Sequence, residues 1–282
     1  MQYYIEHIAS VIQGTVIQDR RNDRIEQLLT DSRRLIFPKS SLFFALKGPR
    51  RDGKTFIDYL YHKGVRNFVV SEQPDLKQFP EANFILVPDV LQALQLLAAY
   101  HRSRFTFPVI GITGSNGKTI VKEWLNQILD QQFAIIRSPK SYNSQIGVPL
   151  SVWPMNESHE LAIFEAGISR KGEMEKLGAI IKPTIGILTN IGEAHSEGFA
   201  SIKEKLEEKL RLFNTVGTLI YRNDQELVEE TIQQLKQSRD IQLFGWGSKK
   251  GGSLQITGIK RGPHSTTLNI LYKGSAQSLV IP

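Results

Sequence analysis

A glycine-rich stretch in the middle of the chain carries the residues with the clearest chemical meaning. It follows a short apolar run at 109–112 and precedes a segment whose apolar residues recur with helical spacing. A glycine-rich turn that opens a helix directs backbone N–H groups and the positive end of the helix dipole at one point, which suits a polyphosphate. The predicted ATP-binding residues are Gly114, Ser115, Asn116, Gly117, Lys118 and Thr119.

Two side chains of this stretch have distinct expected roles. Lys118 would reach the outer phosphates of ATP, and the hydroxyl of Thr119 would hold Mg²⁺. The usual P-loop pattern has a glycine five residues before Gly117, where this chain has Ile112. An ordinary glycine-rich turn between a strand and a helix is therefore the alternative. The combination of strand, helix and Gly-Lys-Thr favours a nucleotide site.

Three further side chains could complete a metal site at the same edge of a sheet. Glu165 closes an apolar strand, where a carboxylate can bind Mg²⁺ opposite Thr119 or can cap a helix. His195 also follows a strand, although a lone histidine is more often structural. Lys209 lies on a highly charged helix at 201–213, and its spacing does not distinguish it from the other lysines of that helix.

A second polar group lies in the first third of the chain. Thr30-Asp-Ser-Arg33 follows an apolar strand and precedes a strand that begins near Ser41. Short polar side chains at a strand end can hydrogen-bond the edge of a heterocycle. Ordinary turn chemistry explains them equally well.

Composition limits the class of protein. A length of 282 residues indicates about two domains, and 40% hydrophobic with 22% charged residues is ordinary for a globular chain. The net charge of +7 comes from scattered basic residues with no aromatic-interleaved stripe, so nucleic-acid binding is not expected. The absence of cysteine excludes disulfides and thiolate chemistry, and no segment resembles a signal peptide or a membrane span.

The order of the expected elements predicts an α/β protein in two parts. Residues 1–105 form a compact α/β unit, with a helix at 1–13 that carries Tyr4, Ile5, Ile8 and Ile12 on one face, a strand at Asn67–Val70 and a helix that Asp89 caps. In 106–282 strands alternate with helices, one of them near Glu173–Ile181, which predicts a parallel sheet with ligands at the carboxyl ends of its strands. Alternating runs between 253 and 281 predict an antiparallel meander at the end of this part. The helix expected at 118–130 carries its apolar residues on one face: Ile120, Val121, Trp124, Leu125, Ile128 and Leu129.

Taken together, these motifs resemble those of the Mur ligase family of cell-wall synthesis. In the first part the similar segments are Thr30-Asp-Ser-Arg, Phe43-Phe-Ala-Leu-Lys-Gly and Asp52-Gly. In the second part they are Gly114-Ser-Asn-Gly-Lys-Thr, Tyr142-Asn-Ser-Gln-Ile-Gly-Val-Pro-Leu, Glu165-Ala-Gly and Asn190-Ile-Gly-Glu-Ala-His. The family has its own P-loop variant, which accounts for Ile112.

The resemblance implies a UDP-sugar-binding domain at 1–105 and an incomplete ATP-binding central domain at 106–282. The implied enzyme is an ATP- and Mg²⁺-dependent ligase that adds D-alanyl-D-alanine to UDP-N-acetylmuramoyl-tripeptide through an acyl phosphate. The implied catalytic residues are Lys118, His195 and Lys209. The implied metal ligands are Thr119, Glu165, His195 and a carbamylated Lys209. The implied UDP-sugar-binding residues are Thr30, Asp31, Ser32, Arg33, Lys47, Gly48, Asn143 and Ser144.

The chain also departs from the family pattern. Lys54 stands where the family usually has a histidine, so no role is assigned to it. The chain ends before the segment that contacts adenine and before the third domain, which binds the incoming amine. It is therefore expected to be an inactive fragment of a monomeric, cytoplasmic ligase without membrane insertion. A fusion of the parent protein to alanine racemase, found in some bacteria, stays open.

Three kinds of alternative function stay open: another P-loop enzyme, a neighbouring Mur ligase and a binding module. A GTPase is disfavoured because no Asn-Lys-x-Asp motif occurs, and a small-molecule kinase also uses a P-loop. The neighbouring Mur ligase that adds the third amino acid has a similar first domain, but Ser115-Asn116 and the segment 143–150 favour the D-alanyl-D-alanine enzyme. A non-catalytic module that binds a nucleotide sugar is the remaining alternative.

Overall fold

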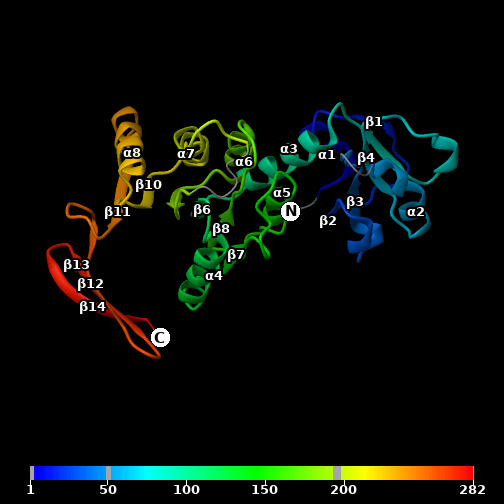
Figure 1. Cartoon of the computed structure of the whole chain (residues 1–282). Coiled ribbons are helices and arrows are strands. Elements are labelled where there is room, and N and C mark those ends of the chain that lie inside the picture. Colours follow the sequence, from blue (N-terminus) through cyan, green and yellow to red (C-terminus); the bar gives the residue numbers. More distant parts are fainter. Residues whose placement is uncertain (1–2, 49–51, 193–197, 282) are drawn as a thin grey trace. The chain divides into compact units, whose positions relative to one another are not determined.

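The computed structural model describes residues 3–48, 52–192 and 198–281 (Figure 1). The chain divides into two compact units, and each is described by itself. The first comprises Met1–Phe105 with Gln145–Asn156, and the second comprises Thr106–Ser144 with Glu157–Pro282. The sequence placed residues 145–156 in the second part. In the structure this segment packs with the first unit through a short helix that the sequence did not predict.

The first unit is built on a five-stranded sheet of order β1-β5-β4-β3-β2. Its edge strand β1 is antiparallel to β5, and the other neighbours are parallel. The strands are β1 (Thr15–Gln18), β2 (Gln27–Leu29), β3 (Ser41–Phe44), β4 (Asn67–Val70) and β5 (Asn83–Leu86). The helices are α1 (Ile5–Val11), α2 (Ile57–His62), α3 (Val90–Ser103) and α5 (Gly147–Val152).

Side chains of this sheet pack on both of its faces because successive residues of a strand point to opposite sides. In β3, Leu42 and Phe44 join the cluster that contains α1, α3 and Trp153. Phe43 joins the other cluster, which contains α2. The first unit therefore has helices on both faces of a mostly parallel sheet, and the buried Ile5 and Ile8 confirm the predicted apolar face of the first helix.

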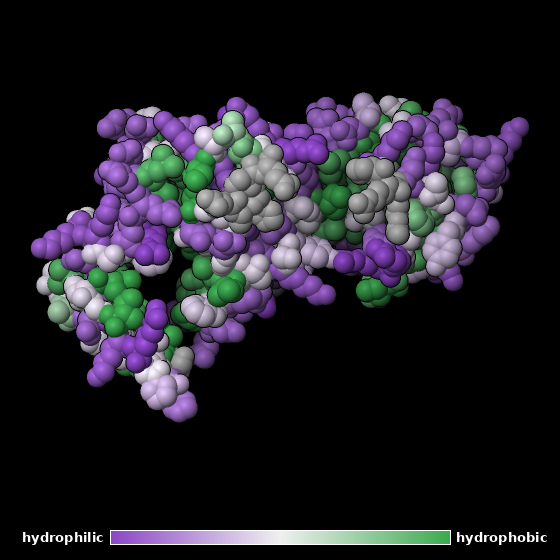
Figure 2. All heavy atoms as spheres, in the orientation of Figure 1, coloured by the Kyte–Doolittle hydropathy of each residue, from purple (hydrophilic) through white to green (hydrophobic). Residues whose placement is uncertain are grey.

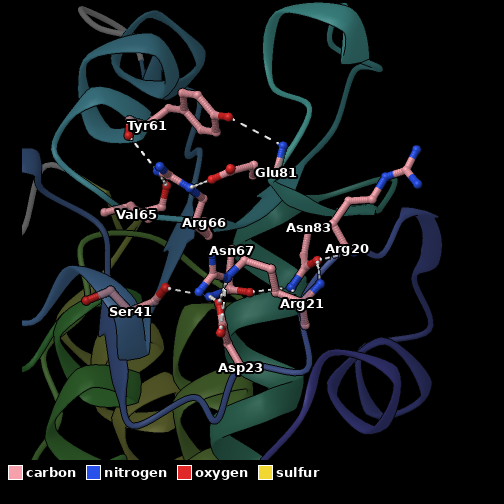
Figure 3. A network of polar contacts seen from close by, with 10 residues as sticks. All are labelled: Arg20, Arg21, Asp23, Ser41, Tyr61, Val65, Arg66, Asn67, Glu81 and Asn83. Atoms are coloured by element: carbon pink, nitrogen blue, oxygen red, sulfur yellow. Dashed lines mark hydrogen bonds and ion pairs between the residues drawn. The ribbon is translucent and has the colours of Figure 1, made fainter.

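Two buried asparagines fasten the loop 19–23 to the amino ends of the parallel strands (Figure 3). The side-chain Oδ1 of Asn83 accepts hydrogen bonds from the backbone N–H groups of Arg20 (2.7 Å) and Arg21 (3.1 Å). Its Nδ2 donates to Oδ1 of Asn67 at 2.7 Å. Thr30 and Lys47 follow the opposite, carboxyl ends of β2 and β3, so this network lies at the other edge of the sheet.

The second unit is built on a nine-stranded sheet of order β14-β13-β12-β11-β10-β9-β6-β8-β7. Strands β6 to β11 are parallel, and β12 to β14 form the antiparallel meander that the sequence predicted. The strands are β6 (Val109–Thr113), β7 (Ile135–Arg137), β8 (Leu161–Glu165), β9 (Ile185–Leu188), β10 (Thr218–Arg222), β11 (Gln242–Gly247), β12 (Leu254–Arg261), β13 (Thr266–Tyr272) and β14 (Ser275–Ile281). The helices are α4 (Lys118–Leu129), α6 (Glu173–Ile181), α7 (Ile202–Leu210) and α8 (Glu226–Ser238).

The apolar residues of α4 form two stripes, and only one of them contacts the sheet. Val121, Leu125 and Leu129 pack against the core formed by β6 and β8. The other stripe is exposed: Ile120 at 58%, Trp124 at 58% and Ile128 at 69%. Neighbouring helical residues differ by about 100° around the axis, so six apolar residues span more than the face that a sheet can cover. The single apolar face read from the sequence is wrong in this respect.

The meander has several apolar side chains at its surface. Ile259, Leu279 and Val280 are 57%, 47% and 65% exposed, and hydrophobic atoms are visible on this part of the molecule in Figure 2.

Among the described residues, no helix combines the length and apolar character needed to cross a membrane.

Candidate functional site

The candidate site lies at the carboxyl ends of the central strands of the second sheet, where the connections from neighbouring strands run in different directions. Strand β6 is flanked by β8 on one side and by β9 on the other. Segments that leave the carboxyl ends of β6, β8 and β9 therefore meet at one edge of the sheet. In open α/β sheets this switch point is the usual place for a ligand.

The loop after β6 has a geometry that requires its glycines. Gly117 has φ +81° and directly precedes α4, so the first N–H groups of the helix have no side-chain cap. Gly114 has φ +148°, and a Cβ on it would lie 2.0 Å from Oγ1 of Thr189. Ile112 is fully buried within β6, which explains why the glycine of the usual pattern is absent there.

This loop is fastened to the segment that follows β9. The N–H of Ser115 donates to the carbonyl of Asn190 at 2.8 Å, and the N–H of Asn116 donates to Oδ1 of the same residue at 2.9 Å. The hydroxyl of Thr189 donates to the carbonyl of Asn116 at 2.6 Å. Hydrogen bonds to the segment after β9 therefore restrict the conformation of the glycine loop after β6. The sequence had flagged Asn190 only as part of a metal motif.

Thr119 and Glu165 are in direct contact. The Thr119 hydroxyl donates to Oε2 of Glu165 at 3.0 Å, and the carboxylate is fully buried. Its second oxygen, Oε1, is buried without a hydrogen-bond partner among the described residues, although Nζ of Lys122 lies 3.6 Å away. A free carboxylate oxygen beside a hydroxyl supplies the hard oxygen donors that Mg²⁺ prefers. The pair therefore fits the predicted metal.

The remainder of the predicted metal site is less defined. Within the described residues, His, Cys, Asp and Glu side chains nowhere gather in a group of three that could hold a metal. His195 lies outside the described residues. Lys209, as an ammonium, offers no lone pair, so it could serve as a ligand only after it loses a proton or is modified.

Three lysines surround the glycine loop. Nζ of Lys118 and Nζ of Lys209 both donate to the carbonyl of Gly114, at 2.9 Å and 3.2 Å. Nζ of Lys205 donates to the carbonyl of Gly192 at 2.6 Å. Burial, helped by the charges of Lys118 and Lys205, lowers the pKa of Lys209 to about 7. The loop is therefore lined with positive charge, and part of the Lys209 population carries a neutral, nucleophilic amine at neutral pH.

A buried carboxylate fixes the helix that carries Lys209. Oε1 of Glu208 accepts the N–H groups of Gly172 (2.8 Å) and Met174 (3.2 Å) at the start of α6, while Oε2 lies 3.2 Å from Arg211. Sequence reasoning missed this contact because Glu208 is one of many charges on α7. Its position beside Lys209 was the available signal.

In the first unit the predicted UDP-sugar residues follow two neighbouring parallel strands. Thr30–Arg33 come after β2, and Lys47 and Gly48 come after β3. Asp31 accepts two side-chain hydrogen bonds from Arg33, at 2.9 Å and 2.6 Å, and this pairing lowers the pKa of Asp31 to about 2. These contacts within the turn are what ordinary turn chemistry predicts, so the ligand role of these residues stays a prediction.

Lys54, to which the sequence assigns no role, contacts a neighbouring acidic side chain. Its Nζ donates to Oε2 of Glu72 at 2.8 Å.

The two remaining UDP-sugar residues, Asn143 and Ser144, belong to the second unit. The carbonyl of Asn143 accepts the N–H of Gly167 at 2.8 Å. Gly167 follows Glu165 by two residues, so this segment lies beside the metal-binding candidate. The predicted set is thus divided between the two units.

Comparison with known proteins finds relatives along nearly the whole of this chain. Residues 112–281 match the Mur ligase middle domain. The UDP-N-acetylmuramoyl-tripeptide–D-alanyl-D-alanine ligase of Bacillus subtilis (strain 168) is 33% identical over 284 residues, which cover 99% of this chain and 59% of that protein. The enzyme of the same name from Synechocystis is 36% identical over 221 residues, 77% of this chain and 48% of that protein.

Solved structures show the same fold. A crystal structure of MurF from Acinetobacter baumannii has a TM-score of 0.89 at 25% identity and covers all of this chain, which spans 61% of that protein. MurF ligase from Thermotoga maritima in complex with ADP has a TM-score of 0.79 at 23% identity, over 90% of this chain and 58% of the other. The present chain therefore spans about three fifths of the length of these relatives.

Proposed function

This chain belongs to the Mur ligase family, and we propose that it serves to join D-alanyl-D-alanine to UDP-N-acetylmuramoyl-tripeptide at the expense of ATP. The observation that carries the proposal is the Thr119–Glu165 pair, 3.0 Å apart, beside a glycine loop lined by lysines. This arrangement suits a phosphoryl transfer, in which the protein positions the phosphates and neutralises their charge. The two proposed substrates are those of the similar ligases, as the names of these ligases state them.

The reaction we propose has two steps. The terminal carboxylate of the tripeptide attacks the γ-phosphorus of ATP, which forms an acyl phosphate and releases ADP. The amine of D-alanyl-D-alanine then attacks the acyl carbon, a C–N bond forms, and phosphate leaves with the C–O bond electrons. Lys118 and the N–H groups of 114–119 would stabilise the charge that develops on the transferred phosphoryl group.

Mg²⁺, when bound, supplies further neutralisation of the phosphate charge. Thr119 and Glu165 would hold it, together with His195 and a carbamylated Lys209. Carbamylation joins the neutral amine of Lys209 to the carbon of CO₂ and releases a proton. A pKa of about 7 favours this reaction, and the product is an oxygen ligand where an ammonium stood.

The UDP-sugar would contact Thr30–Arg33, Lys47, Gly48, Asn143 and Ser144. We further propose that the enzyme works in the cytoplasm, where ATP and nucleotide sugars are available.

An acyl phosphate trap tests this function. The chain is incubated with ATP, Mg²⁺, hydroxylamine and UDP-N-acetylmuramoyl-tripeptide, and the hydroxamate and ADP are measured by mass spectrometry. Hydroxamate that forms with the tripeptide and not with the corresponding dipeptide supports the proposal. Formation with the dipeptide alone would favour the ligase that adds the third amino acid. Binding of both nucleotides without any ADP release, both by this chain and by a protein of its relatives' full length that contains it, would favour a binding module.

A further inference from the structure

Lys122 is a fully buried lysine one helical turn beyond Thr119. Its ammonium donates to the carbonyl of Ser138 at 2.7 Å and to the carbonyl of Lys140. It also lies 3.1 Å from Oε1 of Glu123 at the border of the cluster. A buried charge is costly unless opposite charge and hydrogen bonds compensate it, so this position requires an explanation.

Two carboxylates compensate this charge: the partly exposed Glu123 at 3.1 Å and the fully buried Glu165 at 3.6 Å. The Glu165 carboxylate lies between two groups of α4: the Thr119 hydroxyl contacts Oε2, and Nζ of Lys122 lies 3.6 Å from Oε1. The second distance is too long for a hydrogen bond, so Lys122 attracts Oε1 without occupying its lone pairs. That oxygen keeps its capacity to bind a second cation.

We propose that Lys122 is a positioning residue that serves as the resident countercharge of Glu165 and thereby weakens the affinity of the nucleotide-free site for Mg²⁺. Through attraction it stabilises the buried carboxylate in its contact with Thr119 while no metal is bound. Through repulsion it opposes a divalent cation that arrives alone. A cation that arrives with the phosphates of ATP brings its own negative charge and is not opposed in the same way.

A purely structural role for Lys122 makes different predictions. Its two carbonyl contacts fix the segment Ser138–Lys140, and this alone would justify a buried lysine. In that case loss of Lys122 would loosen the site and weaken metal binding. The countercharge role predicts that loss of its charge strengthens metal binding.

Metal affinity distinguishes the two roles. The probe is Mn²⁺ alone, titrated without nucleotide into the full chain, with free Mn²⁺ followed by electron paramagnetic resonance. Lys122→Gln removes the charge and keeps a donor for the carbonyls, and we expect it to bind Mn²⁺ roughly tenfold more tightly than the unsubstituted chain, because a like charge has been removed. Arg137→Met is the matched control, since Arg137 contacts Glu123 at 3.1 Å but no carboxylate of the metal site. It should leave the Mn²⁺ affinity unchanged.

A thermal double-mutant cycle tests the ion pair without any metal, in case Lys122→Gln perturbs the fold. Lys122→Met should lower the melting temperature, and the loss should be clearly smaller when Glu165→Gln is already present. Equal losses in both backgrounds, or an Mn²⁺ affinity in Lys122→Gln that is unchanged or weaker, would overturn the inference.

The metal part of this inference rests on the proposed function, and the outcomes separate the two. If the unsubstituted chain fails to bind Mg²⁺·ATP, the proposed function is wrong. If it binds Mg²⁺·ATP while the cycle shows no coupling between Lys122 and Glu165, only the countercharge role is wrong.

Discussion

Acidification is expected to destabilise the first unit through one buried histidine. His101 is 4% exposed and lies between two polar partners. Its Nε2 is 3.0 Å from the carbonyl of Met155, which can only accept, so the hydrogen of the neutral ring is on Nε2. Nδ1 then accepts from the hydroxyl of Tyr3 at 2.7 Å. Burial lowers the pKa of His101 to about 4.

The sign and size of the effect follow from linkage. The unfolded chain protonates this histidine near pH 6.5, whereas the folded unit does so only near pH 4, so the unfolded state binds more protons in between. Stability is therefore complete above pH 6.5 and declines as the pH falls toward 4. Between pH 7.5 and 4.5 the loss is about 2.5 kcal/mol of the free energy of unfolding, from the two pKa values and linkage.

Trp153 provides the assay, because its ring lies 4.8 Å from that of His101 and belongs to the same unit. Trp124→Phe and Trp246→Phe leave it as the only tryptophan, and urea unfolding is followed by its fluorescence at several pH values. His101→Gln keeps a donor for Met155 and an acceptor for Tyr3 but cannot titrate. If this variant loses as much stability toward pH 4.5 as the parent chain, the assignment to His101 is refuted.

Three further substitutions test the site and the fold. Lys118→Ala should abolish ATP binding in calorimetry while the circular dichroism spectrum stays unchanged; unaltered ATP affinity would place the nucleotide elsewhere. Ser32→Ala should weaken UDP-sugar binding and leave ATP binding intact, and equal loss of both ligands would indicate misfolding instead. Asp89→Ala removes the side-chain oxygen that accepts the N–H groups of Leu91 and Gln92 at the start of α3, and should cost about 1 kcal/mol of stability in thermal unfolding. A change within error there would show that the cap contributes little.

Several elements were predictable from the sequence because the residues that specify them are local. The helix predicted at Glu173–Ile181 and the strand predicted at Asn67–Val70 have the same bounds in the structure. Asp89 was predicted to cap α3, and its side chain does accept the N–H groups of Leu91 and Gln92 in the first turn. In each case the residues that decide the element lie within it or next to it.

Elements decided by distant contacts were not predictable. Helix α5 has six residues with β-branched positions and a proline, and no period can be read from so short a segment. It is stabilised in the first unit by contacts with α3 and by the following Trp153, whose indole N–H donates to the carbonyl of Glu26 at 2.8 Å. Likewise, the exposure of Trp124 depends on how much of α4 the sheet covers, which the sequence does not state.

The candidate site likewise contains residues that were predictable from the sequence and one that was not. Thr119 and Glu165 were expected to face each other because both follow parallel strands that end at one edge, and the structure brings them into contact. Lys122 was not expected, because a lysine on a helix that packs one face on a sheet is ordinarily assigned to the solvent-exposed face. Only the packing of α4 on β8 shows that it is buried. The ligand roles of these residues stay predictions.

Charge explains why one cluster favours both a nucleotide and a modified lysine. Glu165 is shared between Lys122, whose Nζ lies 3.6 Å from its Oε1, and Lys118, whose pKa its charge raises against the larger effect of burial. Lys118 and Lys209 donate to the same carbonyl of Gly114, and their repulsion adds to burial in lowering the pKa of Lys209. A triphosphate would relieve this repulsion by accepting from both. A carbamate would relieve it by converting one cation into an anion, so the chemistry that prepares the proposed metal ligand and the chemistry that attracts ATP have the same electrostatic cause.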